Sequence, residues 1–296
     1  MAAFWAPESA EPRGVCTNFE LSRPYSLILV TTMTHRILLH ACCGPCSLEP
    51  VRVLRSEGVE PVVFYANSNI HPADEYAHRL DTLRAWAAEE GLEVVEGVYD
   101  PEAWEATAGR VGDAAEAAFG VIVNEEGDRA EGDEPTEARA AREARCRACY
   151  RLRFEEAARY AHEHGFDALG TTLSVSPYQY TAIIREELER ACEREGIRAR
   201  FEDYRPFYNE ATRRSREGGM YRQNYCGCRF SDAEADAERE LRRAERRAVR
   251  EAEAAAHANE RAAEETERAR KRAEKQAYAA KQAKKRAALK ALRERR

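Results

Sequence analysis

Three clusters of cysteines are the residues of this sequence best suited to chemistry. The first, Cys42-Cys43-Gly44-Pro45-Cys46, follows a short apolar run, 37–39. Two pairs come later, Cys146-x-x-Cys149 and Cys226-x-Cys228, so seven of the nine cysteines are clustered. Thiolates bind zinc and iron–sulfur clusters, and they also carry out disulfide exchange. We therefore expect the fold to gather the three clusters at one metal or redox site.

The motif Cys43-Gly44-Pro45-Cys46 has the CGPC sequence of the thioredoxin active site. Its position, after an expected strand and at the start of an expected helix, favours a thiolate because helix amides stabilise negative charge. A thiol–disulfide oxidoreductase using Cys43 and Cys46 is therefore one hypothesis. It leaves five clustered cysteines without a role, and Cys42 stands where thioredoxins have an aromatic residue.

Structural zinc is a second hypothesis, because the pairs at 146–149 and 226–228 could supply a four-thiolate tetrahedral site. The protein would then be a zinc-stabilised RNA-binding protein without redox activity. This hypothesis leaves Cys42, Cys43 and Cys46 unexplained. A 4Fe–4S cluster takes three or four thiolates and accounts better for the count, with the remaining cysteines free to hold a second metal or to form a redox dithiol.

The segments around the cysteines alternate between strand-like and helix-like patterns. The expected strands are 37–40, 59–65, 92–98, 166–171 and 197–204, and the main expected helices are 47–57, 74–91, 145–164 and 180–195. This alternation predicts an α/β fold in which helices flank a parallel sheet. Such folds place active sites at the carboxyl ends of their strands, which is where Cys42 is expected.

The alternating segments belong to an expected catalytic domain, 35–231. Three stretches, two outside this domain and one within it, do not follow the alternating pattern. Residues 1–34 lack periodicity and predict a disordered leader, with Met33 as a candidate for the true start of translation. Residues 107–142 are rich in Gly, Ala, Asp and Glu and predict a mobile acidic insertion. Residues 232–296 lack Gly and Pro and predict a charged helical extension. Its last part, 268–296, has thirteen Lys or Arg against two Glu, a net charge of +11.

The overall net charge of −6 argues against a generic polyanion binder. No stretch approaches the roughly 20 apolar residues of a membrane span. The apolar run 26–32 is preceded by glutamates rather than by the basic region of a secretory signal. We therefore expect a cytoplasmic protein, in which clustered cysteines are more often ligands or catalysts than disulfides.

Five motifs in the right order resemble the QueH family of epoxyqueuosine reductases. They are HACCGPCS, Asn67-Ser68-Asn69-Ile70-His71-Pro72 with Glu75, Tyr76 and Arg79 after it, RCRACYRLR, TTLSVSP and YRQNYCGCRFS. The resemblance covers about residues 35–231. It implies a Rossmann-like (HUP-like) enzyme that reduces epoxyqueuosine to queuosine at the wobble position of tRNA. It also implies a 4Fe–4S cluster with a second, mononuclear iron, and an external electron donor.

The resemblance further implies roles for single residues. The implied metal ligands are Cys42, Cys43, Cys146, Cys149, Cys226 and Cys228, without a division between the cluster and the second iron. The candidate catalytic residues are Cys42, Cys43, Cys46 and Asp100. Asp100 follows the third expected strand and would either bind iron or cap the next helix. Gln179 departs from the family pattern, because a basic residue is expected there.

A wobble base must be presented unstacked, among aromatic, arginine and other polar side chains. The candidate substrate-binding residues are Asn67, Asn69, His71, Tyr150, Arg153, Tyr221, Arg222 and Gln223. The alternative is that the tyrosines belong to the core, the arginines to a solvated helix face, and His71 to the ordering of its loop. The basic C-terminal part is expected either to be a solvated helix or to attract RNA phosphates.

Overall fold

A five-stranded parallel sheet forms the centre of the protein in the computed structural model, which describes residues 36–123 and 136–294. The strands are β1 (Ile37–His40), β2 (Val62–Tyr65), β3 (Val94–Glu96), β4 (Ala168–Thr171) and β5 (Arg198–Arg200). Their order is β3-β2-β1-β4-β5, and every neighbouring pair is parallel. The predicted α/β class is confirmed. From β1 the chain adds β2 and β3 on one side of the sheet, and from β4 it adds β5 on the other side. The direction of strand addition therefore reverses between β1 and β4, and in such folds ligands bind at this switch point.

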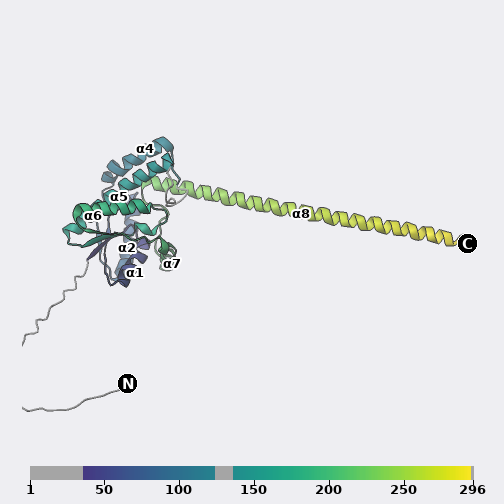
Figure 1. Cartoon of the computed structure of the whole chain (residues 1–296), viewed down its shortest axis with the longest axis horizontal. Coiled ribbons are helices and arrows are strands. Elements are labelled where there is room, and N and C mark those ends of the chain that lie inside the picture. Colours follow the sequence, from purple (N-terminus) through teal and green to yellow (C-terminus); the bar gives the residue numbers. More distant parts are fainter. Residues whose placement is uncertain (1–35, 124–135, 295–296) are drawn as a thin grey trace, which may run out of the picture. The chain divides into compact units, whose positions relative to one another are not determined.

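Helices cover both faces of the sheet, and this explains why β1 and β4 are buried at every residue. Successive side chains of β1 point to opposite faces, so Leu38 and Leu39 belong to two separate apolar clusters. Leu39 packs with α1 (Gly44–Ser56) and α2 (Ala73–Glu90), and Leu38 packs with α5 (Glu137–Glu163) and α6 (Thr181–Glu195). Figure 1 shows α5 and α6 side by side on one side of the sheet, and α1 and α2 on the other.

The remaining helices connect these layers. They are α3 (Pro101–Trp104), the π-helical η1 (Glu105–Gly109), α4 (Arg110–Phe119), the 3-10 turns η2 (Leu173–Val175) and η3 (Arg205–Phe207), α7 (Tyr208–Glu217) and α8 (Arg229–Glu294). The strands β3 and β5 are shorter than the expected 92–98 and 197–204.

The expectation that 107–142 is mobile is wrong for residues 107–119 and 137–142, which are helical. Their buried face is made of small residues such as Ala108 and Ala115, which give a weak hydrophobic pattern. Gly112 lets the ring of Phe230 approach so closely that an added Cβ would lie 2.2 Å from it. Residues 124–135, and the predicted leader 1–34, lie outside the described residues.

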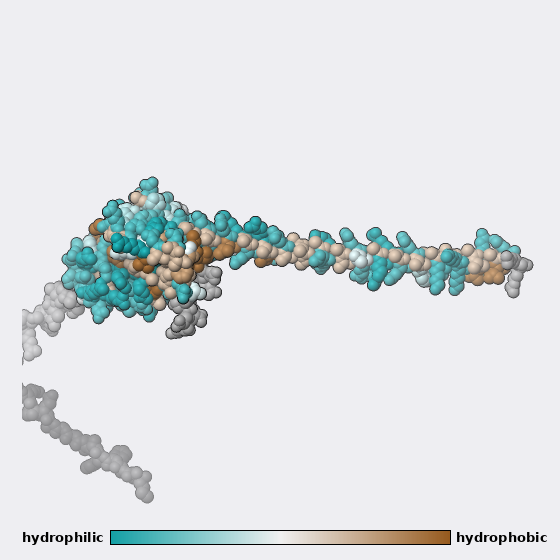
Figure 2. Space-filling view, turned by 90° about the horizontal axis from the view of Figure 1, so that it is seen from above, coloured by the Kyte–Doolittle hydropathy of each residue, from teal (hydrophilic) through white to brown (hydrophobic). Residues whose placement is uncertain are grey.

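The predicted charged C-terminal helix is confirmed as α8, a single helix of 66 residues. Only Phe230, Ser231 and Glu234 of α8 are buried, and from residue 240 to 294 every side chain except Gln282 is exposed. Figure 2 shows hydrophilic side chains along its length. None of the described helices, α8 included, has a stretch apolar enough to cross a membrane.

Candidate metal and substrate site

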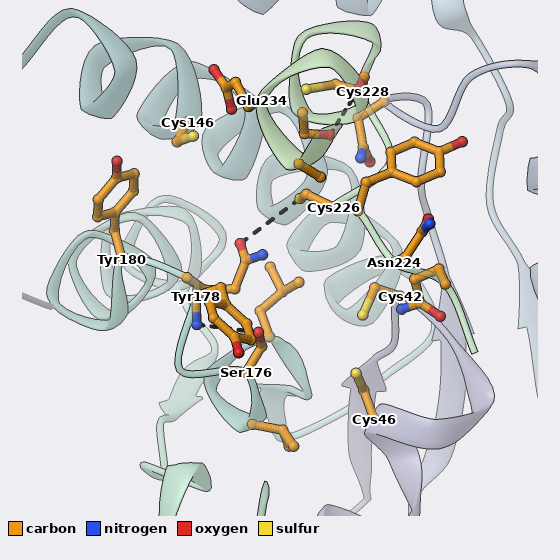
Figure 3. Close-up of a pocket in the computed structure, with 18 of the residues that line it drawn as sticks. Cys42, Cys46, Cys146, Ser176, Tyr178, Tyr180, Asn224, Cys226, Cys228 and Glu234 are labelled. Carbon is orange, nitrogen blue, oxygen red and sulfur yellow. Dashed lines mark hydrogen bonds between the residues drawn. The ribbon is translucent and has the colours of Figure 1, made fainter. Parts of the chain in front are cut away.

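A pocket of about 360 Å³ lies beyond the carboxyl ends of β1 and β4. Its wall comes from the segments that follow these two strands, from α5, from 222–228 and from the first turns of α8. Six cysteines from the three sequence clusters line it, namely Cys42, Cys46, Cys146, Cys149, Cys226 and Cys228. Figure 3 shows Cys226 between Cys146 on α5 and Cys42 near the sheet. Clusters that are far apart in the sequence therefore meet at one pocket.

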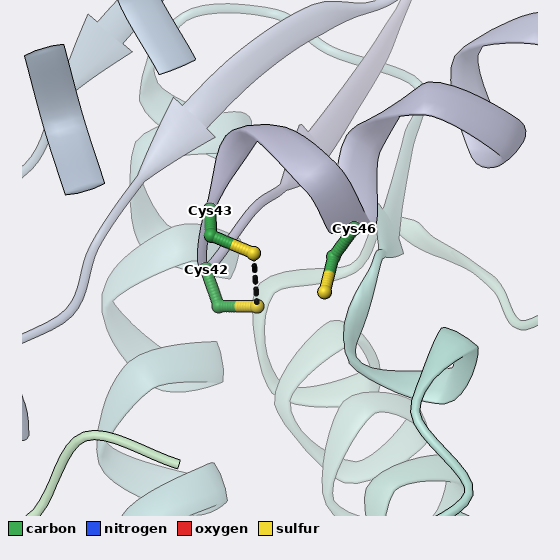
Figure 4. Close-up of side chains that lie close together, drawn as sticks. All are labelled: Cys42, Cys43 and Cys46. Carbon is green, nitrogen blue, oxygen red and sulfur yellow. Dashed lines mark hydrogen bonds between the residues drawn. The ribbon is translucent and has the colours of Figure 1, made fainter. Parts of the chain in front are cut away.

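Cys42, Cys43 and Cys46 form the first thiol group, and their sulfur atoms all lie within 4.8 Å of one another. β1 ends at His40 and α1 begins at Gly44, so Cys42 and Cys43 occupy the turn between them. Cys46 follows in the first turn of α1, and the three sulfurs converge (Figure 4). The strand-to-helix turn therefore produces a group able to hold one metal ion.

This first group concentrates negative charge on a single sulfur. Hydrogen bonds from the thiols of Cys42 and Cys46 lower the pKa of Cys43 well below its ordinary value, and the amide Nε2 of Gln223 donates to the same sulfur at 3.0 Å. The hydrogen bond with Cys43 in turn raises the pKa of Cys42 to about 11. The thiols of Cys42 and Cys43 also raise the pKa of Cys46 well above its ordinary value, so Cys42 and Cys46 keep their protons while Cys43 becomes the thiolate. A bound cation can replace these two protons.

Cys146, Cys149, Cys226 and Cys228, called the second thiol group below, line the same pocket, although among the described residues only the first group has its sulfurs within 4.8 Å of one another. Cys146 and Cys149 lie one turn apart on α5, and the other two lie just before α8. Burial raises the pKa of all four thiols, to about 12 for Cys149, and the charges of their neighbours in the group raise it further. Cys149 and Cys228 are buried and Cys146 and Cys226 are half-buried, and nearby arginines only partly offset the rise in pKa. Four such thiols suit a metal centre, which adds the positive charge that favours their thiolate form.

Three buried polar atoms of residues that line this pocket have no hydrogen-bond partner among the described residues, namely Nε1 of Trp104, Oδ1 of Asn69 and Nε of Arg145. The Trp104 indole packs with Cys149, and its interaction with that thiol opposes the effect of burial on the pKa of Cys149. An indole N–H can donate to a metal-bound thiolate. Both the sulfur donors and this N–H, which lowers the pKa of the Cys149 thiol, therefore fit an iron–sulfur centre.

Four of the eight candidate substrate-binding residues line the pocket, namely Asn69, Tyr150, Arg222 and Gln223. Tyr150 is buried, and its hydroxyl donates to Oε1 of Gln179 at 2.7 Å. Burial raises the pKa of Tyr150 well above its ordinary value, so this tyrosine keeps its proton.

The other four candidate substrate-binding residues do not line the pocket, and their contacts hold neighbouring loops in place. Asn67 donates to the carbonyl of Ala41 at 2.9 Å and accepts from the guanidinium of Arg153. The hydroxyl of Tyr221 donates to Glu75 at 2.7 Å, and the ring of His71 lies 5.6 Å from that of Trp104.

Asp100 also lies outside the pocket lining. Its carboxylate accepts a hydrogen bond from the backbone N–H of Ala103 at 2.9 Å, so it caps α3, one of the two roles expected for it. Cys192 is buried on α6 within the apolar cluster of α5 and α6, and it does not line the pocket.

The mouth of the pocket has an aromatic surface that the sequence does not reveal. The ring of Tyr178 is 46% exposed and forms an edge-on contact with Tyr208, with ring centroids 6.1 Å apart. The guanidinium of Arg242 lies 5.9 Å from the Tyr178 ring centroid. These residues come from the loop after β4, from α7 and from α8, and only the position of Tyr178 next to Ser176-Pro177 offered a signal.

A buried ion-pair cluster joins α8 to α5 at the pocket. The carboxylate of Glu234 accepts hydrogen bonds from Arg145 at 2.6 Å and from Arg142 at 2.9 Å. Arg142 also donates to the hydroxyl of Tyr180 at 2.6 Å. Figure 3 shows Glu234 close to Cys146. The same two arginines lower the pKa of Cys146, although burial outweighs them.

Comparison with known proteins identifies a family. Residues 37–118 and 128–234 match the family described as "Epoxyqueuosine reductase QueH". The protein of that name from Histophilus somni is 31% identical over 203 residues, which is 67% of this chain and 72% of the relative. The one from Dehalococcoides mccartyi is 29% identical over 203 residues, 68% of this chain and 95% of the relative.

A solved structure was also found, the predicted subunit of a tRNA methyltransferase from Methanocaldococcus jannaschii. It is 13% identical and has a TM-score of 0.36 over 61% of this chain and 76% of its own. This likeness is too weak to bear on fold or function.

Proposed function

The chain belongs to the epoxyqueuosine reductase QueH family, and we propose that it reduces epoxyqueuosine to queuosine in tRNA by means of iron held at its two thiol groups. It is thus an oxidoreductase of tRNA modification. The observation that carries the proposal is the meeting of six cysteines at one pocket on the switch point of the sheet. Its volume of about 360 Å³ lies in the range of small-molecule sites.

The reaction consumes two electrons and two protons. The two C–O bonds of the epoxide break, a carbon–carbon double bond forms, and the oxygen leaves as water. The electrons come from an external donor. When bound, an iron–sulfur centre supplies single electrons and a further iron supplies Lewis acidity.

The number of sulfurs in each thiol group supports the assignment of a different metal centre to each. Cys146, Cys149, Cys226 and Cys228 provide the four thiolates that a 4Fe–4S cluster takes. Cys42, Cys43 and Cys46 provide three sulfurs within 4.8 Å, enough for a mononuclear iron with an open position. We assign the cluster to the second group and the mononuclear iron to the first.

The remaining pocket residues orient the ligands and the substrate. Gln223 donates to the sulfur of Cys43 and so fixes it in the first group. Tyr150, which keeps its proton, holds the amide of Gln179 in the pocket wall. At the mouth, the exposed ring of Tyr178 offers a face on which an unstacked nucleobase can stack.

The two other hypotheses have less support. A dithiol switch at Cys43 and Cys46 gives no reason for a third sulfur, that of Cys42, within the same 4.8 Å. A zinc-stabilised RNA-binding protein gives no reason for the first thiol group at all.

The test is an assay on tRNA that carries epoxyqueuosine. Protein reconstituted anaerobically with iron and sulfide, and given a chemical reductant, is expected to convert the modified nucleoside to queuosine, as read by mass spectrometry. Protein loaded with zinc alone serves as the control. Equal conversion by the zinc-loaded protein would refute the proposal.

A further inference from the structure

Most of α8 lies beyond the part of the chain shared with the family, because the family match ends at residue 234. The Dehalococcoides mccartyi relative is matched over 95% of its own length by only 68% of this chain. The reductase fold therefore does not require residues 235–294. A helix of this length, kept exposed, calls for a separate explanation.

The charge of α8 changes sign along the helix. Residues 235–267 have ten Asp or Glu against seven Arg, a net charge of −3. Residues 268–294, called the basic segment below, have eleven Lys or Arg against two Glu, a net charge of +9. The positive charge is therefore confined to the last turns of the helix.

Most cations of the basic segment are not neutralised by the helix itself. The ion pairs that the structure describes there involve Arg268, Arg270, Lys271 and Lys290. Within the described part of the chain, seven others have no ion-pair partner, namely Arg272, Lys275, Lys281, Lys284, Lys285, Arg286 and Arg293. Like charges four residues apart, such as Lys281 and Lys285, each destabilise a helix by about 0.2–0.5 kcal/mol. The segment thus keeps a charge that weakens its own helix.

A second copy of the chain is not a suitable partner for the surface of the basic segment. Its large apolar side chains are Tyr278, Leu289 and Leu292, which are 66%, 53% and 66% exposed. Lys285 and Gln282 interrupt the seam that these three would form, so a coiled coil is not supported. Two such segments side by side would also repel each other. A polyanion with regularly spaced charges is the complementary partner.

We propose that the basic segment of α8 binds the phosphate backbone of the tRNA substrate, at nucleotides remote from the base in the pocket. The choice of tRNA rests on the proposed function. The helix begins at the pocket, because Glu238, Arg239 and Arg242 belong to its lining. At a rise of about 1.5 Å per residue, the basic segment starts roughly 39 Å along the helix from Arg242 and ends roughly 78 Å from it. A tRNA whose wobble base enters the pocket presents phosphates at such distances, whereas an isolated anticodon stem–loop is much shorter.

The test compares two charge variants of the full-length, iron-loaded protein. In the distal variant, Arg272, Lys275, Lys281, Lys284 and Lys285 are changed to Gln, which preserves helix propensity. In the matched control, five exposed arginines of the preceding segment are changed to Gln, namely Arg243, Arg246, Arg247, Arg250 and Arg261. Equilibrium binding of full-length tRNA and of its anticodon stem–loop is measured over a series of salt concentrations. Circular dichroism checks that the helix remains.

The distal variant is expected to bind full-length tRNA at least about tenfold more weakly at low salt. The slope of log K against log salt should become shallower by about 3.5–4.5, if each of the five lost cations had neutralised one phosphate. Binding of the stem–loop should stay the same, and the control variant should bind both RNAs within about twofold of the wild type.

An unchanged affinity and slope of the distal variant for full-length tRNA would overturn the inference. An equal loss in the control variant would also overturn it, because general charge would then explain the effect. Binding of the wild type to anionic phospholipid vesicles, lost in the distal variant while tRNA binding is kept, would assign the surface to a membrane instead. These outcomes are separate from catalysis: a protein that binds tRNA in this way without reducing epoxyqueuosine refutes the proposed function alone.

Discussion

At the scale of single residues, Cys149 and Cys192 illustrate what separates a candidate ligand from a core thiol. Both are buried, and burial raises the pKa of each to about 12. Cys149, however, is affected by the charges of Cys226 and Cys228 and by the indole N–H of Trp104, which lowers its pKa. Cys192 packs among apolar residues of α5 and α6. The surroundings, and not burial itself, mark Cys149 as a candidate metal ligand.

This contrast predicts the effect of removing either sulfur. Cys149→Ser is expected to lose most of the iron and sulfide of the anaerobically purified protein, because the proposed cluster would lose one of its four ligands. Cys192→Ala should keep the wild-type metal content, with a moderate loss of stability for a small buried side chain, about 1 kcal/mol. Iron and sulfide assays on both variants decide the matter. A similar loss in both would mean that Cys149 acts through packing.

A second prediction concerns Tyr178 at the pocket mouth. Stacking of a base on an aromatic ring contributes about 1–3 kcal/mol. Tyr178→Ala should therefore weaken binding of the modified anticodon stem–loop by roughly 5- to 150-fold, whereas Tyr178→Phe, which keeps the ring, should bind within about twofold. Equal loss in both variants would point to the hydroxyl group, and no loss in either would remove the ring from the binding site.

At the residue scale, part of the candidate site could be predicted from the sequence and part could not. Each cysteine cluster could be predicted to hold candidate ligands, because thiol spacing within a cluster is a strong local signal. The pocket mouth could not, because Tyr178 and Arg242 are 64 positions apart and meet only where α8 begins against the loop after β4. Arg153 was expected at the substrate, yet its guanidinium is buried and donates to Asn67. In the sequence, a basic residue near a pair of candidate ligand cysteines gives the same pattern whether it binds substrate or forms a buried contact within the fold.

At the scale of elements, one buried carboxylate secures the start of α8. Glu234 accepts from Arg142 and Arg145 of α5, and its side chain is only 4% exposed. Glu234→Gln leaves two buried guanidinium groups without their counter-charge, so we expect a loss of about 3–5 kcal/mol in stability. The matched control is Glu264→Gln, whose exposed pair with Arg268 is expected to contribute about 0.5 kcal/mol or less. Denaturant unfolding measures both, and equal effects would contradict the anchoring role.

The contact between α5 and α6 should depend on pH through Glu187. Burial alone would raise the pKa of Glu187, but hydrogen bonds from Arg151 and Arg147 outweigh it and hold the pKa below its ordinary value. A carboxyl group of this kind stabilises the fold above its unfolded pKa, about 4.3, and the contribution is lost as pH falls through the lower folded pKa.

Glu187→Gln should therefore lower stability at pH 7 by about 2 kcal/mol, and the difference from the wild type should shrink below about pH 4. Unfolding curves at several pH values measure it. Glu186→Gln, at a side chain that is 52% exposed, should have little effect at any pH. A difference for Glu187→Gln that persists unchanged into acid would show that shape, and not charge, is responsible.

Element boundaries show a clear limit of sequence patterns. β1 and β4 could be predicted because continuous apolar runs mark strands buried on both faces. The start of α5 at Glu137 was missed, although Thr136 caps it by accepting from the N–H of Arg139. The first turns of α5 and the whole of α4 bury small residues and arginines, and their composition resembles that of a solvated loop.

At the scale of the whole molecule, the order of the strands explains why the thiol groups meet. β1 and β4 are neighbours in the sheet although about 130 residues separate them, so the segments after both strands open into one pocket. α5 places the Cys146–Cys149 pair against that edge, and the chain returns with Cys226 and Cys228 before it continues as α8. No local pattern encodes this convergence; the parallel topology produces it.

The most direct test of the central claim is the iron, zinc and acid-labile sulfide content of the wild-type protein purified anaerobically. With a 4Fe–4S cluster at the second thiol group and one iron at the first, we expect about five irons and four sulfides per chain, and no stoichiometric zinc. An enzyme that reduces epoxyqueuosine while carrying zinc and no sulfide would contradict the account.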